Sequence, residues 1–543
     1  MDSAFVGHVH ALRLALTDPR FDACAVTGAF AVQPGARDVL DKAAALAPEG
    51  PGPYADRLAD AVEAAGTFVQ RPELGTLVAS VPAGPAERDA ATAAVAAVDD
   101  EAVRLRTAVK SRDGFFTTFF ISPYSRYIAR WCARRGLTPN QVTTASLITA
   151  LIAAGCAATG ERWGYVAAGV LLVVSFVLDC TDGQLARYSL QYSTMGAWLD
   201  ATFDRAKEYS FYAGLALGAA SNGDDVWGLA VGSMILMTCR HVVDFSFNEA
   251  NHDATANTSP TAALSDRLDS VGWTVWVRRM IILPIGERWA MIAVLTAFTT
   301  PRIVFYALLI GCAFGALYTT AGRVLRSLTR KATRTDRAAQ ALADLADSGP
   351  LAELQARLLR GRAGSFGSVY VAALGTLLMV GAALYLPFGD PRLIAVAVVY
   401  AMAAGLAVSA PLKGALDWLI PPLFRAAEYV TVLVLAAKAD VPGALPAAFG
   451  LIAAVAYHHY DTVYRIRGGT GAPPHWLVRT IGGHEGRVLL LTVLAAVLMS
   501  RAVDFPVALT AMAVFVALVV LVESIRFWVS SGAPAVHDEG EPA

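Results

Sequence analysis

Residues Asp179 to Asp204 read DCTDGQLARYSLQYSTMGAWLDATFD and connect two apolar segments near 163–180 and 196–220. Side chains spaced i, i+3, i+4 and i+7 share one face of a helix, and this spacing relates Asp179, Asp182, Gly183 and Ala186. On the next helix an i, i+4, i+8 spacing relates Gly196, Asp200 and Asp204. Because a short connection makes the two helices antiparallel neighbours, the sequence predicts that four carboxylates converge where the helices meet.

Apolar segments along the rest of the chain predict a polytopic membrane protein. Of the 543 residues, 55% are hydrophobic and 16% charged, and the mean hydropathy is +0.48, whereas a soluble domain carries about a quarter of its residues as charge. Segments suited to crossing a bilayer lie near 142–159, 163–180, 196–220, 226–246, 288–300 and 302–320. A second set lies near 368–387, 391–410, 423–437, 444–462, 486–501 and 504–528. The predicted fold class is mainly α, with a six-helix membrane bundle, a second C-terminal block of membrane helices and a small soluble N-terminal α/β region.

Composition divides the chain into five parts. Residues 1–110 contain no apolar run long enough to cross a membrane. Short β-branched runs alternate there with Ala-rich helical patterns at 54–65 and 87–109, which predicts a soluble α/β region. Residues 111–325 hold an interfacial helix and the first membrane domain. The remaining parts are a basic cytoplasmic linker, a second membrane domain and a disordered tail, at 326–365, 366–530 and 531–543.

Charge and cysteine content exclude several classes of protein. The formal net charge of −1 gives no general affinity for nucleic acid. The six cysteines form no CxxC pair and lie mostly in apolar stretches, so no disulfide framework is expected. The N-terminus lacks a basic region followed by an apolar core, so no cleavable signal peptide is expected.

The segment from Phe115 to Arg135 precedes the first membrane helix. Its aromatic residues gather at one end and its arginines at the other, which favours a helix lying in the headgroup zone; a buried soluble helix is the alternative. Thr138 and Pro139 then favour the start of a new helix, as its N-cap and first helical residue.

Basic residues between the two membrane blocks predict the orientation in the membrane. By the positive-inside rule they place this segment in the cytoplasm; they are Arg323, Arg326, Arg330, Lys331, Arg334, Arg337, Arg357, Arg360 and Arg362. The arginines before Leu137 lie on the same side, so the first block crosses an even number of times, as about six helices do. The predicted aspartate cluster then lies near the cytoplasmic face of the plasma membrane. Richness in Arg and Ala favours a bacterial source.

A cluster of carboxylates on membrane helices requires compensating charge. Each central aspartate costs about 2.5–3.5 kcal/mol on insertion scales, and mutual repulsion adds to that cost. Hard oxygen ligands suit Mg²⁺, Mn²⁺ or Ca²⁺, so a divalent cation is predicted. Gly183 and Ala186 leave a gap for a planar group, and Arg187 can offer its guanidinium to a phosphate. In the alternative interpretation, the aspartates pair with Arg187, Arg205 and Lys207 in a solvated hairpin.

The spacing D-x2-D-G-x2-A-R-x8-G-x3-D-x3-D is unbroken from Asp179 to Asp204. It resembles the signature of the CDP-alcohol phosphotransferase (phosphatidyltransferase) family. The resemblance covers roughly residues 115–325 and includes Pro139-Asn140-x-x-Thr143 at the start of the first membrane helix. It implies a six-helix bundle, an integral membrane transferase of phospholipid synthesis, and pairing of two copies into a homodimer.

The resemblance also implies roles for individual residues. Mg²⁺ or Mn²⁺ would be held by the carboxylates of Asp179, Asp182, Asp200 and Asp204. Asp204 would also act as the general base that takes the proton of an acceptor hydroxyl, which attacks the β-phosphorus of the donor and releases CMP. The CDP-linked donor would be bound by Gly183, Ala186, Arg187, Gly196, Asn140 and Thr143.

Polar residues at the end of the fourth apolar segment predict the acceptor site. Arg240 and His241 are candidate ligands, because a membrane arginine that faces the bundle can bind a phosphate; alternatively, Arg240 snorkels to the surface. A phosphate ligand favours an acceptor such as inositol phosphate or glycerol phosphate, with CDP-diacylglycerol as the favoured donor. The alternatives are a CDP-inositol- or CDP-choline-type donor with another alcohol, and a non-catalytic ion-binding scaffold or transporter.

Residues Arg112 to Phe116 and the soluble region resemble a branch of the family that carries a fused nucleotidyltransferase-like domain and handles inositol phosphates. The region lacks the glycine-rich nucleotide loop of such domains. We therefore interpret it as a degenerate remnant without transferase activity.

Polar residues of the second block lie near helix ends, where interfacial anchoring is the commonest role. One group includes Arg425 and Glu428, and another includes His458, His459 and Asp461. The two adjacent histidines are a poor metal pair, because neighbouring positions of a helix point about 100° apart. The sequence leaves the role of this block open.

Overall fold

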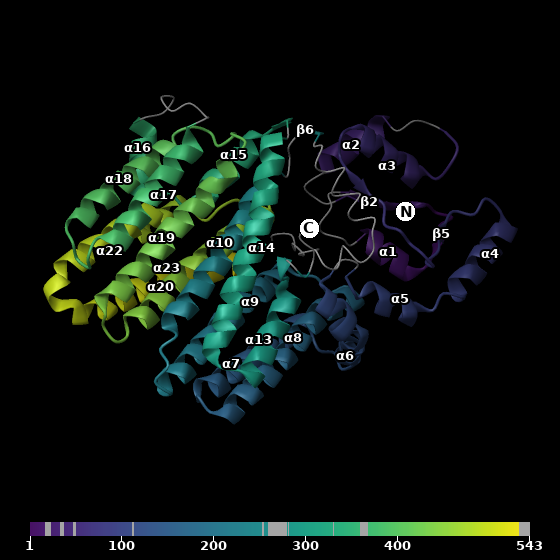
Figure 1. Ribbon diagram of the computed structural model, residues 1–543. Coiled ribbons are helices and arrows are strands. Elements are labelled where there is room, and N and C mark those ends of the chain that lie inside the picture. Colours follow the sequence, from purple (N-terminus) through teal and green to yellow (C-terminus); the bar gives the residue numbers. More distant parts are fainter. Residues whose placement is uncertain are drawn as a thin grey trace.

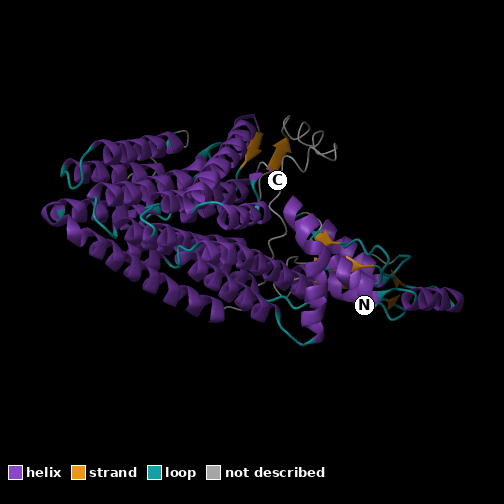
Figure 2. Cartoon of the chain, turned by 60° about the horizontal axis from the view of Figure 1, so that its bottom comes forward, coloured by secondary structure: helices purple, strands orange, loops and turns teal. Residues whose placement is uncertain are grey.

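The computed structural model describes residues 1–16, 23–32, 37–46, 50–110, 113–251, 255–258, 280, 282–329, 331–358 and 367–530. The predictions made for Arg112, Arg330, Arg360, Arg362 and the tail at 531–543 lie outside the described residues. Helices dominate the chain, and strands are few and short (Figure 2).

The N-terminal region is a small α/β unit, as predicted. Its elements are β1 (Val6–Gly7), α1 (Val9–Leu16), β2 (Ala23–Val26), β3 (Ala29–Val32), α2 (Arg37–Leu46), α3 (Tyr54–Ala64), β4 (Val69–Gln70), β5 (Ala79–Ser80), α4 (Pro85–Ala96) and α5 (Asp100–Thr107). Strand β2 pairs antiparallel with β3 and parallel with β4, and β1 pairs antiparallel with β5. The single helix predicted at 87–109 is two helices, because Asp99 caps a new one by accepting the Ala102 N–H at 3.0 Å.

A short helical segment leads from this unit to the first membrane block. It consists of a π-helical turn, η2 (Thr117–Ile121), and α6 (Ser122–Arg134). Small residues of α6, such as Ser125 and Ala129, are buried, whereas Tyr127 and Trp131 are exposed. The helix is thus amphipathic, with aromatic side chains on its outer face, which suits the predicted interfacial position.

In its described residues the first block has six long helices, and close backbone approach holds them together. They are α7 (Pro139–Ala158), α8 (Arg162–Ser189), α9 (Thr194–Ser221), α10 (Trp227–Asn251), α13 (Ile285–Phe298) and α14 (Pro301–Thr329). Thr138 and Gln141 form a capping box at the start of α7. Cβ atoms on Gly214 and Gly218 of α9 would lie 2.3 and 2.0 Å from backbone oxygens of α7. Small residues therefore set the α7–α9 contact, as is usual between membrane helices.

The second block adds six more long helices. Its elements are α17 (Ser368–Tyr385), α18 (Arg392–Ala407), η3 (Asp417–Leu419), α19 (Ile420–Ala439), α20 (Ala444–Arg467), α21 (His475–Ile481), α22 (Gly483–Val497), η4 (Met499–Asp504) and α23 (Phe505–Ser530). Helix α10 packs on α19 and α20, so both blocks share one hydrophobic core. Figure 1 shows the second block, in green and yellow, beside the teal helices of the first block.

The segment between the blocks is more than a linker. Strands β6 (Thr255–Thr258) and β7 (Lys331–Thr333) pair antiparallel, and α15 (Asp336–Leu345) and α16 (Pro350–Leu358) form a helical hairpin. Leu342 and Leu345 are buried, and the hairpin packs on α10, α18, α20 and α22. The hairpin is therefore part of the folded second block.

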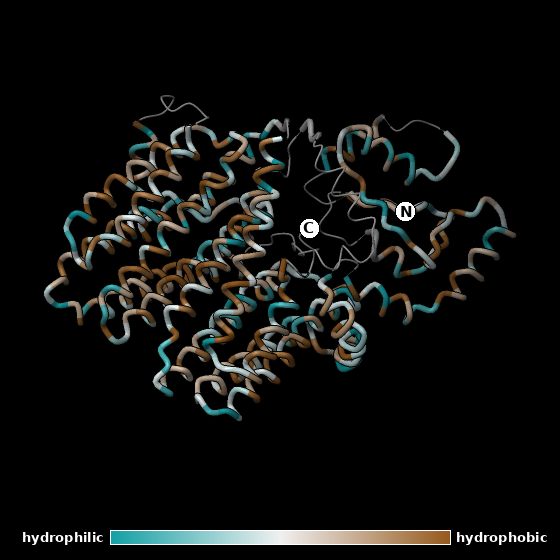
Figure 3. Tube along the Cα trace, viewed as in Figure 1, coloured by the Kyte–Doolittle hydropathy of each residue, from teal (hydrophilic) through white to brown (hydrophobic). Residues whose placement is uncertain are grey.

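Within the described part of the chain, eight helical segments are long and apolar enough to cross a membrane. They include α7, α8, α10 and α14 of the first block. Hydrophobic residues run along the helices of both blocks in Figure 3. The chain is a polytopic α-helical membrane protein, as its composition predicts.

Candidate active site

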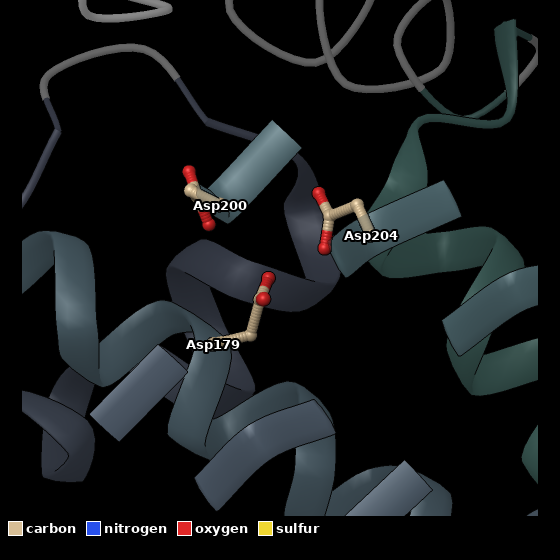
Figure 4. Close-up of side chains that lie close together, drawn as sticks. All are labelled: Asp179, Asp200 and Asp204. Carbon is tan, nitrogen blue, oxygen red and sulfur yellow. The ribbon is translucent and has the colours of Figure 1, made fainter. Parts of the chain in front are cut away.

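Three of the predicted aspartates meet between two neighbouring helices. Asp179 lies in the last turns of α8, and Asp200 and Asp204 lie in the first turns of α9. One carboxylate oxygen from each lies within 4.8 Å of the other two. Figure 4 shows the three side chains turned toward one another. The spacing of the sequence and the short connection between the helices produce this convergence.

Asp182 lies about one turn beyond Asp179 and is more deeply buried. It is 4% exposed, and the Thr143 hydroxyl of α7 hydrogen-bonds to it. Its Oδ2 atom has no hydrogen-bond partner among the described residues. A buried carboxylate oxygen without a hydrogen-bond partner is unfavourable unless a cation binds to it or the carboxyl group is protonated.

Lys207 of α9 lies beside the aspartates and is fully buried. Its ammonium contacts the Asp179 carboxylate, lies 2.9 Å from Asp204 Oδ1 and donates to Ser146 Oγ at 3.2 Å. The other two cations of the alternative interpretation have different contacts. Arg205 pairs with Glu208 at 2.8 Å, and Arg187 Nε donates to the Ala108 carbonyl at 2.6 Å. Lys207 therefore compensates Asp179 and Asp204 directly, as in that interpretation.

The residues predicted to bind the donor surround the same helix junction. Gly196 follows the N-cap Ser193, whose Oγ accepts the Gly196 N–H at 2.9 Å. A Cβ on Gly196 would lie 2.8 Å from Asn140 Oδ1, and a Cβ on Gly183 would lie 3.5 Å from the Arg187 guanidinium. Ala186, at 6% exposure, lies between Gly183 and the end of α8. The small side chains thus keep space open beside Asn140 and Arg187.

Comparison with known proteins identifies this block. Residues 136–317 match the sequence model of the CDP-alcohol phosphatidyltransferase family. The first membrane block is a CDP-alcohol phosphatidyltransferase domain. This family consists of transferases, and the matched range contains the whole aspartate motif.

Three curated relatives resemble the transferase domain. An archaetidylinositol phosphate synthase of Pyrococcus horikoshii is 33% identical over 21% of this chain and 58% of its own length. A phosphatidylinositol phosphate synthase of Mycolicibacterium smegmatis is 37% identical over 22% of this chain and 53% of its own length. A bifunctional IPC transferase and DIPP synthase of Aquifex aeolicus is 31% identical over 21% of this chain and 26% of its own length. The chain thus matches 58%, 53% and 26% of the length of these three relatives.

The second block has a separate match. Residues 336–543 match a family of unknown function, DUF5941. This match begins at the first residue of α15, so it includes the helical hairpin as well as the membrane helices that follow.

The candidate acceptor residues lie on α10, where the transferase domain meets the second block. Arg240 is 6% exposed and donates to the Ile282 carbonyl, so it does not snorkel to the surface. His241 Nδ1 hydrogen-bonds to the hydroxyl of Tyr460 on α20. Asp244, one turn further along α10, pairs with Arg323 of α14.

Tyr460 links the second block to both sides of the site. The Arg205 guanidinium, next to Asp204 in sequence, lies 5.4 Å from the centre of the Tyr460 ring. Trp198 of α9 stacks on Trp528 of α23 with ring centres 6.1 Å apart. No pattern within the transferase segment predicts these contacts, because their partners lie more than 200 residues away in the chain.

A buried ion-pair network that the sequence did not predict supports α9 behind the aspartates. Glu208 accepts from Arg205 at 2.8 Å, from Tyr212 at 2.7 Å and from Arg288 Nη2 of α13 at 3.3 Å. In the sequence, this network is indicated only by the position of Glu208, one turn after Asp204. Since this carboxylate lies between two guanidiniums, the network ties α9 to α13 one turn beyond Asp204.

Proposed function

We propose that the protein transfers a phosphatidyl group from CDP-diacylglycerol to the hydroxyl of a polar acceptor and releases CMP. The observation that carries this proposal is the convergence of Asp179, Asp200 and Asp204 within 4.8 Å inside a domain of the transferase family. The names of two relatives, an archaetidylinositol phosphate synthase and a phosphatidylinositol phosphate synthase, contain inositol phosphate, which favours an inositol phosphate acceptor over glycerol phosphate.

The residues at the site suit a hard divalent cation, Mg²⁺ or Mn²⁺. Four carboxylates from two helices supply oxygen ligands, and the orphaned Oδ2 of Asp182 lies buried beside them. Asp179, Asp182, Asp200 and Asp204 would hold the cation. When bound, it would neutralise the diphosphate of the donor and the charge on departing CMP.

Asp204 is the proposed general base. The Lys207 ammonium at 2.9 Å stabilises its ionised form, which can accept a proton. Asp204 takes the proton of the acceptor hydroxyl, a bond forms from the hydroxyl oxygen to the β-phosphorus, and the bond from that phosphorus to the CMP oxygen breaks. Arg240 and His241 would orient the phosphate of the acceptor.

The orientation of the site is part of the proposal. The ends of α8, α10 and α14 and the starts of α9 and α13 lie on one side of the first block. Arg323 and Arg326 lie in the last turns of α14 on that same side. The positive-inside rule then supports a site at the cytoplasmic face of the membrane. The proposal also includes a bacterial plasma membrane, which the composition favours, and a homodimer, which the family resemblance implies.

The test is CMP release by purified full-length protein in nanodiscs, with CDP-diacylglycerol, Mg²⁺ or Mn²⁺, and separate acceptors. We expect release that requires the metal and inositol phosphate, and that stops with a chelator. Release that requires CDP-inositol or a CDP-choline-type donor would replace the proposed donor. Silence with every donor and acceptor would favour the non-catalytic scaffold or transporter.

A further inference from the structure

A cavity in the second block lies away from the transferase site. Its volume is about 390 Å³, and it lies between the α15–α16 hairpin on one side and α20 and α21 on the other. Pockets that bind small molecules measure about 300–1,000 Å³. All of its lining residues fall inside the match to the family of unknown function.

The base of the cavity is built around Asp347, at the turn between α15 and α16. Asp347 is 3% exposed and has a left-handed backbone with φ of 54°, which is strained for a residue other than glycine. The turn is locked in place because Glu485 of α22 accepts the N–H groups of Gly349 and Ala352, each at 3.1 Å. Arg487 of the same helix donates to Asp347 Oδ2 at 2.7 Å.

His458 presents a hydrogen-bond acceptor to this cavity. Its Nε2 lies 3.0 Å from Asp347 Oδ1 and donates to it, because a carboxylate accepts, and Nδ1 is then the ring nitrogen that can accept. His458 is 1% exposed and lines the cavity, and its Nδ1 has no partner among the described residues. The Oγ of Ser348, also in the lining, is buried without a partner in the same part of the structure. Each of these two atoms can form a hydrogen bond with a hydroxyl group of a ligand.

The wider lining mixes guanidinium and carboxylate groups. Arg479 donates to Glu353 at 2.9 and 3.0 Å, and Arg357 donates to the same carboxylate at 3.3 Å. Asp344 accepts from the Gln340 amide at 2.8 Å. Two arginines thus meet at Glu353, Asp344 is held by an amide, and Asp347 is paired with Arg487. A strongly anionic ligand would meet Glu353 and Asp344, whereas hydroxyl groups can donate to the acids and accept from the arginines.

We propose that this cavity binds a polyol, an uncharged polyhydroxylated group of about the size of a monosaccharide. The group is either a free polyol or the polyol head group of a membrane lipid. In both cases a hydroxyl donates to His458 Nδ1, another contacts Ser348, and the remaining hydroxyls meet Asp344 and the arginines. The proposal does not depend on the transferase activity.

The test uses the full-length protein in phosphatidylcholine nanodiscs and isothermal titration calorimetry with myo-inositol, glucose and inorganic phosphate. Native mass spectrometry of nanodiscs that also contain phosphatidylinositol covers the lipid source. We expect saturable binding of a polyol, or retention of phosphatidylinositol. Either result supports the site, and the difference identifies the source.

Substitutions in the lining test whether the polyol binds in this cavity. His458→Leu removes the acceptor, and Ala356→Phe fills the cavity without removing any polar partner, so it keeps the test valid if His458→Leu does not fold. Both should weaken binding at least tenfold, whereas Leu354→Phe, on the exposed side of the same helix, should not change it. Binding of phosphate alone, equal binding by Ala356→Phe, or no binding of any probe would overturn the proposal.

Discussion

The two membrane blocks bury charged side chains in opposite ways. In the transferase domain, Asp179, Asp200 and Asp204 meet within 4.8 Å, and the Lys207 ammonium contacts two of them, Asp179 and Asp204. In the second block, Arg425 and Arg487 each face Asp347 and Glu428, with closest contacts of 2.5–2.7 Å. The first cluster carries an excess of negative charge, whereas the second is balanced within the protein.

This difference distinguishes a ligand-binding site in the first block from a structural ion-pair network in the second. Carboxylates that gather with an excess of negative charge repel one another unless a cation binds, so their convergence where α8 meets α9 points to a ligand. A balanced network satisfies its own hydrogen bonds and holds its helices in register. In the second block the proposed ligand site therefore lies beside the network, at His458 and Ser348, and not within it.

The largest expected effect follows removal of the proposed base. Asp204→Asn should lower the rate of CMP release by about 10²–10⁴-fold, because the amide cannot take the proton of the acceptor. The measurement is the initial rate with saturating donor and metal. Glu161→Gln, a carboxylate lost from the exposed N-cap of α8, is the control and should retain full activity; equal loss in both variants would contradict the role of Asp204.

The balanced network should respond through stability instead. Asp347→Asn leaves Arg487 and Arg425 without their shared carboxylate and should lower the free energy of unfolding by about 3–5 kcal/mol. Thermal unfolding in detergent measures this. Asp336→Asn, at an exposed pair with Lys413, should leave the Tm unchanged.

The same variant predicts a dependence on pH. Burial raises the pKa of Asp347, but Arg487 and His458 lower it well below its usual value. The unfolded chain then binds more protons than the native protein, so the stabilisation is present above about pH 4 and is lost as the pH falls further. The difference in Tm between wild type and Asp347→Asn should shrink in acid; a difference that grows as the pH falls would show that the carboxylate is not held in its ionised form.

A smaller effect is expected where Lys207 balances the aspartates. Lys207→Met removes the ammonium, so the carboxylates depend on the metal alone, and Mn²⁺ should raise the Tm more in the variant than in wild type. Lys438→Met, which removes contacts to the Leu384 and Leu386 carbonyls in the second block, is the control. If Mn²⁺ does not change the Tm of Lys207→Met, the cluster is not a cation site.

The smallest effect is expected at the contact between the blocks. Tyr460→Phe removes the hydroxyl bonded to His241 and should raise the KM for the acceptor about fivefold, the equivalent of one hydrogen bond of about 1 kcal/mol, with little change in kcat. Tyr400→Phe, whose hydroxyl bonds to His484 Nδ1 at 2.7 Å within the second block, should stay within twofold. A fall in kcat with unchanged KM would show that Tyr460 does not act through acceptor binding.

Local spacing explains why much of the transferase site could be predicted. Helical periodicity aligns Asp179 with Asp182 and Asp200 with Asp204, and the short connection through Leu190 forces the two faces together. The same spacing does not determine whether the Lys207 side chain points toward the aspartates, since a lysine three residues after Asp204 can also extend into solvent. Its burial follows from packing against Ser146 of α7.

The second block shows where such patterns stop being informative. Arg425, Glu428 and His458 were expected to be interfacial anchors, yet each is at most 2% exposed. Their partners include Asp347, which the sequence assigned to a linker. The arginine nearest to that aspartate is Arg487, 140 residues further along the chain. No periodicity connects residues so far apart.

The sequence by itself determined the membrane helices and the meeting of the aspartates, because both depend on hydrophobicity and helix geometry over a few turns. Only the tertiary structure decided that the hairpin at 336–358 completes the second block, that Tyr460 reaches His241, and that His458 lines a cavity. Those contacts depend on which helix faces meet. That choice is made by side-chain packing and charge compensation over the whole molecule, which no short segment contains.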